Sequence, residues 1–233
     1  MQDVAKFVGK ERYSVEDLVA ILKVLRSPEG CPWDREQDHK SIRRDFLEEC
    51  YEAIEAIDTA NPVLLREELG DVLLQIVFHS TIEEEEGRFN FYDVVSDVAE
   101  KMVVRHPHVF ADTLAETTEE VLTNWDQIKR ETKQQKSDRE VLESVSPAMP
   151  ALMRAQKVRK KAAKMGADAG DTESVKAKIC AAVAEADEEN AFETLGRALF
   201  DMTELCRHLG ADAEQALYET CRAYIEGFET SKN

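Results

Sequence analysis

Four acidic residues form two closely spaced pairs in the N-terminal half of the chain: Glu49 with Glu52, and Glu68 with Asp71. Within each pair the residues are three positions apart, which places both carboxylates on one side of a helix. Carboxylates that converge cannot all stay ionised without a cation. Oxygen ligands without histidine or cysteine favour Mg²⁺ or Mn²⁺, and Mg²⁺ commonly takes substrate phosphates as its remaining ligands. The pattern therefore indicates an enzyme that acts on phosphates.

Two helices must position these carboxylates. Apolar periodicity predicts one helix over 41–58 and another over 62–86, and the short turn 59–61 makes them antiparallel neighbours. Both acidic pairs lie on the flank of an apolar stripe that should face the core. The expected core residues are Ile42, Phe46, Cys50, Ala53 and Ile57 on the first helix and Leu65, Leu69, Val72, Leu73 and Ile76 on the second.

The second of these helices carries two further patterns. Leu74 and Phe78 point away from its stripe, which predicts a surface for a partner. The run Glu83-Glu84-Glu85-Glu86 near its end reads as a solvated helix face without chemistry.

Helix signals continue along the rest of the chain, and no convincing strand pattern appears, so we expect an all-α fold. Ser14 with Asp17 resembles a capping box, and Gly30-Cys31-Pro32-Trp33-Asp34 should form a loop. Further helices are expected at about 15–27, 90–105, 117–132, 151–165, 172–188, 191–209 and 212–229.

Composition narrows the possible partners. The chain has 233 residues and a formal net charge of −18, which repels nucleic acid polymers and anionic membranes. Its five cysteines form no C-x-x-C pair, so a reducing cytoplasm is the expected location. No apolar run reaches the roughly 18 residues needed to span a membrane. No G-x-x-x-x-G-K-[ST] loop occurs, so the protein is not expected to be a P-loop enzyme.

Several segments together resemble the MazG family of nucleoside triphosphate pyrophosphohydrolases. They follow in family order and cover nearly the whole chain. The segments are Gly30 to Asp34, Glu49-x-x-Glu52, Glu67-Glu68-Leu69-Gly70-Asp71, Glu86-Gly87-Arg88-Phe89, Arg105-His106-Pro107-His108-Val109-Phe110, Trp125-Asp126-Gln127-Ile128-Lys129 and Pro150 to Lys157.

The resemblance implies hydrolysis of nucleoside triphosphates to monophosphate and pyrophosphate, with Mg²⁺ held by the four carboxylates. It implies a house-cleaning role and a homodimer with intertwined bundles. Lys101 and Arg105 match the phosphate-binding Lys-x-x-x-Arg of the family, and Trp125 and Lys129 match its Trp-x-x-x-Lys. Trp33 belongs to a loop expected near the site.

The general base follows from proximity to the ligands. Glu48, which adjoins them in sequence, and Glu52 are both candidates, and the sequence does not choose between them.

The resemblance also divides the chain into a repeat over 1–133 with an intact site, a linker over 134–150 and a degenerate repeat over 151–233. In the second repeat the ligand positions hold Ala182, Glu185, Thr194 and Arg197, and the phosphate-clamp positions hold Ala223 and Gly227. We expect this repeat to serve only in packing. Arg197 could pair with Glu185 in place of a metal.

Two alternatives belong to other classes. One is a non-catalytic nucleotide-binding or regulatory helical dimer. The other is a di-iron carboxylate bundle, which requires inward Glu-x-x-His pairs on two helices. The only such spacing is Glu36 to His39, in an expected loop.

Overall fold

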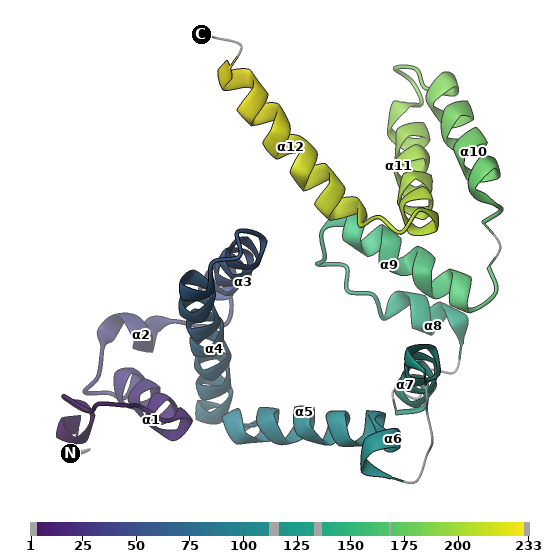
Figure 1. Ribbon diagram of the computed structural model, residues 1–233. Coiled ribbons are helices and arrows are strands. Elements are labelled where there is room, and N and C mark those ends of the chain that lie inside the picture. Colours follow the sequence, from purple (N-terminus) through teal and green to yellow (C-terminus); the bar gives the residue numbers. More distant parts are fainter. Residues whose placement is uncertain (1–3, 112–116, 133–136, 168, 231–233) are drawn as a thin grey trace. The chain divides into compact units, whose positions relative to one another are not determined.

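The computed structural model describes residues 4–111, 117–132, 137–167 and 169–230 of the chain. Within these ranges every regular element is a helix and no strand occurs, so the predicted all-α class is confirmed. None of the helices in the described ranges combines the length and hydropathy required to cross a bilayer. The chain divides into two compact units, residues 1–121 and 122–233 (Figure 1).

The first unit is built around a pair of long helices, α3 and α4, which pack against each other. Helix α1 packs on α4, and α5 leaves the far end of α4 (Figure 1). The elements of this unit are η1 (Val4–Phe7), α1 (Val15–Arg26), α2 (Pro32–Glu36), α3 (Arg43–Asp58), α4 (Pro62–Glu85), α5 (Phe91–Arg105), α6 (Pro107–Phe110) and the start of α7 (Thr118–Thr132).

A tight turn joins α3 to α4. Ala60 adopts a left-handed conformation with φ of 50°. The Asn61 N–H donates to the Ala56 carbonyl at 2.9 Å, and the Ala60 N–H donates to the Ile57 carbonyl at 3.0 Å. These are the two hydrogen bonds of a Schellman motif. The Asn61 side chain then caps α4, and Pro62 occupies its first turn. Local chemistry thus sets the antiparallel pairing.

The core of the first unit lies where α1 crosses α4. Its buried members are Val19, Leu22, Ile42, Val77, Phe78, Ile82 and Phe91. The prediction that Leu74 and Phe78 face a partner is wrong: Phe78 is 5% exposed, and Leu74 packs against the same cluster. Helix α1 covers this side of α4, which the periodicity of α4 alone could not show.

The predicted core stripes are correct only in part. Leu69 on α4 is 54% exposed and Ile57 on α3 is 59% exposed, whereas Ala53 and Ala56 are buried. The two helices meet through small residues of α3, so some of their larger apolar side chains, such as Ile57 and Leu69, remain exposed.

The expected loop at 31–34 contains a short helix, α2. Gly30 precedes it at a place where the backbone is tightly folded, because an added Cβ would lie 2.2 Å from the Val24 carbonyl oxygen. The Cys31 N–H donates to the Leu25 carbonyl at 2.7 Å. This close approach to the end of α1 requires glycine.

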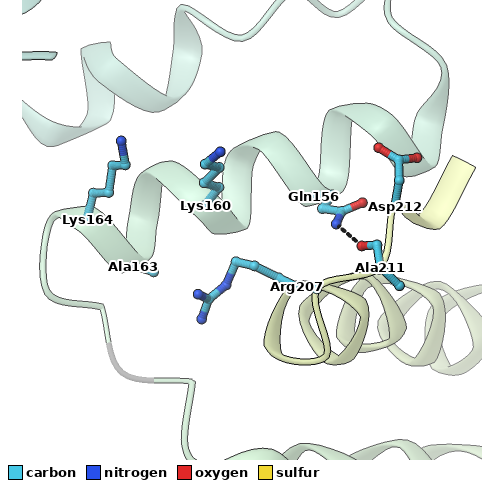
Figure 2. Close-up of a pocket in the computed structure, with 8 residues that line it drawn as sticks. Gln156, Lys160, Ala163, Lys164, Arg207, Ala211 and Asp212 are labelled. Atoms are coloured by element: carbon cyan, nitrogen blue, oxygen red, sulfur yellow. Dashed lines mark hydrogen bonds between the residues drawn. The ribbon is translucent and has the colours of Figure 1, made fainter. Parts of the chain in front are cut away.

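The second unit contains another helix pair, α10 and α11, with α9 packed across α11. The Gln156 amide of α9 donates to the Ala211 carbonyl at 2.7 Å and accepts from the Ala213 N–H at 2.9 Å, which fixes the turn before α12 (Figure 2). The helices are α8 (Asp138–Glu143), α9 (Ala151–Lys164), α10 (Thr172–Glu185), α11 (Ala191–His208) and α12 (Ala213–Thr230).

Charged side chains join α9 to α11. Arg159 forms an ion pair with Asp201 and lies 3.9 Å over the Phe200 ring. Glu204, only 1% exposed, accepts from Arg207 at 2.6 and 3.1 Å. The hydrogen bond from Arg207 lowers the pKa of the Glu204 carboxyl and keeps it ionised.

The expected pair between Arg197 and Glu185 is wrong. Both side chains are exposed, and no ion pair links them in the described part of the second unit. The charges that stabilise α11 lie in the next turns of that helix instead.

Candidate active site

Three carboxylates from α3 and α4 converge beside the helix seam. One ligand oxygen from each of Glu49, Glu68 and Asp71 lies within 4.8 Å of the others. Glu68 is 7% exposed, and Glu49 and Asp71 are half-buried. Among the described residues this is the only group of three or more acidic, histidine or cysteine side chains so arranged.

The carboxylates repel one another. Burial, followed by the charges of Asp71 and Glu52, raises the pKa of Glu49. Burial also raises the pKa of Glu68, together with the charge of Glu52 and a hydrogen bond shared with it. Glu52 therefore adjoins the cluster through Glu68. A divalent cation would relieve this repulsion, so the donor set suits a hard metal ion.

Glu48 occupies a different position from Glu52. Its side chain is 58% exposed and lies 3.9 Å from Arg44 on the same helix. The residue contributes only a small charge effect to the raised pKa of Glu49. Of the two candidate bases, only Glu52 forms a hydrogen bond with a member of the cluster.

Gln75 was not singled out from the sequence. It lies one helical turn beyond Asp71 on α4, is 8% exposed, and its Oε1 accepts no hydrogen bond in the described structure. Its spacing of four from Asp71 and seven from Glu68 puts all three side chains on one helix face. A polar residue continuing the acidic face was the signal available in the sequence.

The candidate phosphate clamp lies elsewhere on the first unit. Lys101 is exposed and Arg105 is half-buried, both on α5. Helix α5 begins beyond the far end of α4 (Figure 1). Asp71 is roughly 20 Å along α4 from that end, and Lys101 is roughly 15 Å along α5 from its start. Because α5 runs away from the end of α4 rather than back along it (Figure 1), the described part of the chain does not bring this pair to the carboxylates.

The two tryptophans occupy different helices. Trp33 lies on α2 and is 58% exposed. Trp125 is half-buried on α7. Lys129, one turn further along α7, lines a cavity of about 280 Å³ in the second unit with Arg130 and Lys161.

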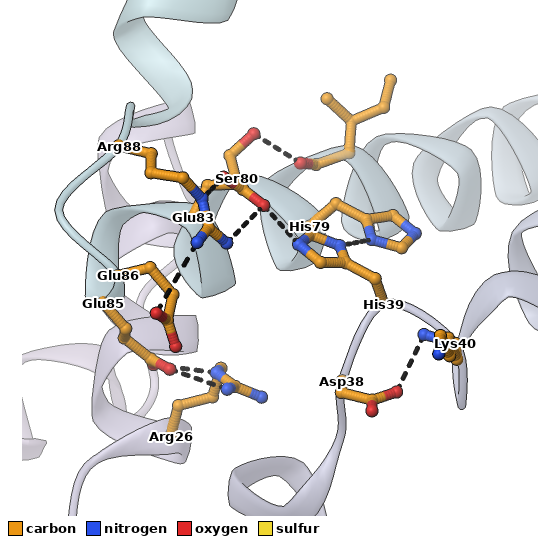
Figure 3. Close-up of polar contacts among 11 residues, drawn as sticks. Arg26, Asp38, His39, Lys40, His79, Ser80, Glu83, Glu85, Glu86 and Arg88 are labelled. Carbon is orange, nitrogen blue, oxygen red and sulfur yellow. Dashed lines mark hydrogen bonds and ion pairs between the residues drawn. The ribbon is translucent and has the colours of Figure 1, made fainter.

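The acidic run at the end of α4 is a solvated face only in part, because Glu84, Glu85 and Glu86 are exposed but Glu83 is not. The Glu83 side chain is 12% exposed and accepts from Arg88 at 2.5 Å. It also lies 2.5 Å from Nε2 of His39, whose Nδ1 lies 2.7 Å from Nδ1 of His79 (Figure 3). The Arg88 hydrogen bond lowers the pKa of Glu83 to about 2. Burial, followed by the charge of His39, lowers the pKa of His79.

Glu85 makes a second anchor beside this cluster. It accepts two hydrogen bonds from Arg26, at 2.7 and 2.8 Å, and the Arg26 side chain is 6% exposed. Arg26 also donates to the Asp34 and Gln37 carbonyls. The end of α4 is thereby tied to α1 and to the segment that leads into α3.

Together, an all-α hairpin and an oxygen-only cluster at its seam define a helical protein with a carboxylate cluster that could hold a metal ion. Residues 37–110 match the MazG nucleotide pyrophosphohydrolase domain. Because relatives of this family that are 41% and 42% identical each cover 92% of the chain, the chain belongs to the MazG family, as predicted.

Its relatives match over most of the chain. A Thermotoga maritima protein named nucleoside triphosphate pyrophosphohydrolase/pyrophosphatase MazG is 41% identical over 218 residues, covering 92% of this chain and 84% of the relative. The nucleoside triphosphate pyrophosphohydrolase of Escherichia coli K12 is 42% identical over 224 residues, covering 92% and 85%. That of Mycolicibacterium smegmatis is 34% identical over 197 residues, covering 84% and 59%.

Proposed function

We propose that this chain is an enzyme that hydrolyses nucleoside triphosphates to nucleoside monophosphate and pyrophosphate, and that it clears unwanted members of the nucleotide pool. The convergence of Glu49, Glu68 and Asp71 at one seam is the observation that carries the proposal. The names of the relatives agree with this reaction.

The cluster would hold Mg²⁺, or Mn²⁺ in its place, with Glu52 as a fourth carboxylate. Mutual repulsion of buried acids and the unpartnered Oε1 of Gln75 support a cationic or hydrated occupant there. When bound, the metal would neutralise phosphate charge and lower the pKa of a water molecule.

The side chains of the chain would perform the remaining work. Glu52, held by Glu68, would orient the attacking water and accept its proton, and it is favoured over Glu48 by position. Lys101, Arg105 and Lys129 would bind the leaving pyrophosphate. Trp125 and Trp33 would contact the base.

A homodimer would bring the clamp to the carboxylates. Val95, Val98 and Met102 on α5 are 38–48% exposed and form one line. Lys101 and Arg105 lie beside that line on the same side of the helix. An apolar face of this kind is suited to packing against a second copy, whose carboxylates would then meet the clamp.

The second unit would be a degenerate repeat that has lost the metal site and hydrolyses nothing. Its α10–α11 pair corresponds to α3–α4, and Thr194 and Arg197 stand at the ligand positions of α11. A cytoplasmic location would suit the five cysteines, all of which are free thiols.

The test is pyrophosphate release from a panel of nucleoside triphosphates and deoxynucleoside triphosphates with Mg²⁺. Mutation of a residue that hydrogen-bonds to a metal ligand typically lowers activity roughly 10–100-fold. Glu49→Gln changes a proposed ligand itself, so it should lower kcat/KM by more than this. Glu67→Gln, an exposed neighbour of Glu68, is the matched control and should retain activity. Nucleotide binding without turnover by the wild-type chain would favour a regulatory protein instead.

A further inference from the structure

Helix α9 is a basic element in an acidic protein. It carries six cations and no acidic residue, whereas the whole chain has 48 acidic and 30 basic residues. Four of the cations recur at positions i, i+3, i+4 and i+7 and fall within an arc of about 100°. We call this set, Lys157, Lys160, Lys161 and Lys164, the lysine face. Like charges at these spacings destabilise a helix unless an anion compensates them.

Packing within the second unit does not use the whole lysine face. Arg159, on the opposite side of α9, forms the ion pair with Asp201 of α11. Lys161 donates to the Val141 carbonyl and the Ser144 hydroxyl near α8, at 3.1 and 2.9 Å. Lys160 makes no hydrogen bond or ion pair with any described residue. The positive charge of Lys160 is therefore not used in holding the described part of the second unit together.

A concave pocket lies beside Lys160. It has a volume of about 630 Å³ and is formed by α9, the last turn of α11 and the turn before α12 (Figure 2). Three cations line it: Lys160, Lys164 and Arg207. The volume falls within the range typical of small-molecule sites.

The frame of this pocket is held in place. Gln156 holds the turn through both the nitrogen and the oxygen of its side-chain amide. Glu204 orients the Arg207 guanidinium through Nε and one Nη, while the other Nη has no acceptor among the described residues. The one acid that lines the pocket, Asp212, accepts from the Gln215 N–H at 2.9 Å and so caps α12.

We propose that this pocket is a second anion site, which binds a pyrophosphate group. Lysine ammonium groups and a fixed guanidinium fork are the donors that phosphate oxygens require. The size of the pocket and the acidity of the rest of the chain favour a small polyphosphate over a nucleic acid polymer. The ligand is either free pyrophosphate or the tail of a nucleotide.

Calorimetric titration of the full-length chain tests this proposal. Inorganic pyrophosphate and ATP are titrated separately in excess EDTA, so that no metal bridges phosphate to the carboxylates. One pyrophosphate should bind per chain, more weakly as salt rises. Similar dissociation constants for the two ligands would show that the phosphate groups are sufficient for binding. Tighter binding of pyrophosphate would identify the free anion as the ligand, and tighter binding of ATP would identify the nucleotide as the ligand.

Variants locate the binding. Lys160→Ala with Lys164→Ala should weaken pyrophosphate binding at least about tenfold, as expected for loss of charged hydrogen bonds. Lys157→Ala removes the same charge from the same face outside the pocket and should change the dissociation constant less than about twofold. The proposal would be overturned if the wild-type chain bound no pyrophosphate or bound only ATP. It would also be overturned if the double variant and Lys157→Ala lost pyrophosphate affinity equally.

Discussion

Glu68→Gln should have opposite effects on stability with and without metal. Glu68 is buried beside Glu49 and Asp71, and its pKa is raised by burial and then by the charge of Glu52. Replacing its carboxylate with an amide of the same shape removes part of the repulsion. In EDTA at pH 7 the variant should therefore melt at a higher temperature than the wild-type chain.

Metal should reverse this order. Mg²⁺ at a hundred times its dissociation constant stabilises a folded protein by about 2.7 kcal/mol. For a unit of the size of residues 1–121, this corresponds to a rise in Tm of roughly 10 °C. The variant lacks one of the three clustered ligands, so its rise should be much smaller, and the two Tm values should cross as Mg²⁺ is added.

The stability difference between Glu68→Gln and the wild-type chain in EDTA should depend on pH. A carboxyl whose pKa is raised in the folded state destabilises that state when ionised, above its ordinary value near 4.5. The advantage of the variant in EDTA should thus be present at pH 7 and shrink as pH falls through the raised pKa.

The assay is differential scanning fluorimetry across pH and Mg²⁺, with Glu67→Gln as the control that should follow the wild type. Equal gains in Tm from Mg²⁺ for Glu68→Gln and the wild type, or a lower Tm for the variant in EDTA, would contradict repulsion and metal binding at this cluster.

Three further predictions concern the frame of the site. Ala60→Gly should raise the free energy of unfolding by about 1 kcal/mol in urea titration, because it removes a side chain from a left-handed turn position; an unchanged midpoint would contradict the Schellman geometry. Glu83→Gln should lower Tm at pH 7, and the difference from wild type should fade as pH drops from about 4.5 toward about 2, since the Arg88 hydrogen bond lowers the pKa of Glu83. Gly30→Ala should cost more than about 2 kcal/mol by steric clash, whereas Gly70→Ala, with open space around it, should gain about 0.5–1 kcal/mol; similar effects of the two would refute the close approach at Gly30.

Features set by neighbours in sequence could be predicted from the sequence. The Ser14 capping box, with Asp17, is present at the start of α1, as expected. The approach of Glu49 to Glu68 and Asp71 followed from helical spacing and a turn too short to allow any other pairing. These features depend on residues close together in the chain, so periodicity and the residues at helix caps can predict them.

Features that depend on distant segments could not be predicted. Phe78 is buried because α1 covers that side of α4, and Glu85 is paired because Arg26, 59 residues earlier, reaches it. The helix at Pro32–Glu36 depends on the tight backbone around Gly30. No periodic pattern within one helix reports which neighbour will cover it.

The ionic contact between α9 and α11 has a consequence for folding fidelity. Two long helix hairpins in one chain could exchange covering helices while they fold. Helix α4 presents Val77 and Phe78 to α1, whereas α11 buries Thr203 and Glu204 and pairs Asp201 with Arg159 of α9. Placing α1 over α11 would leave Asp201 without Arg159, and placing α9 over α4 would bury Arg159 without a carboxylate. Each hairpin therefore discriminates against the covering helix of the other by the cost of an unpaired charge.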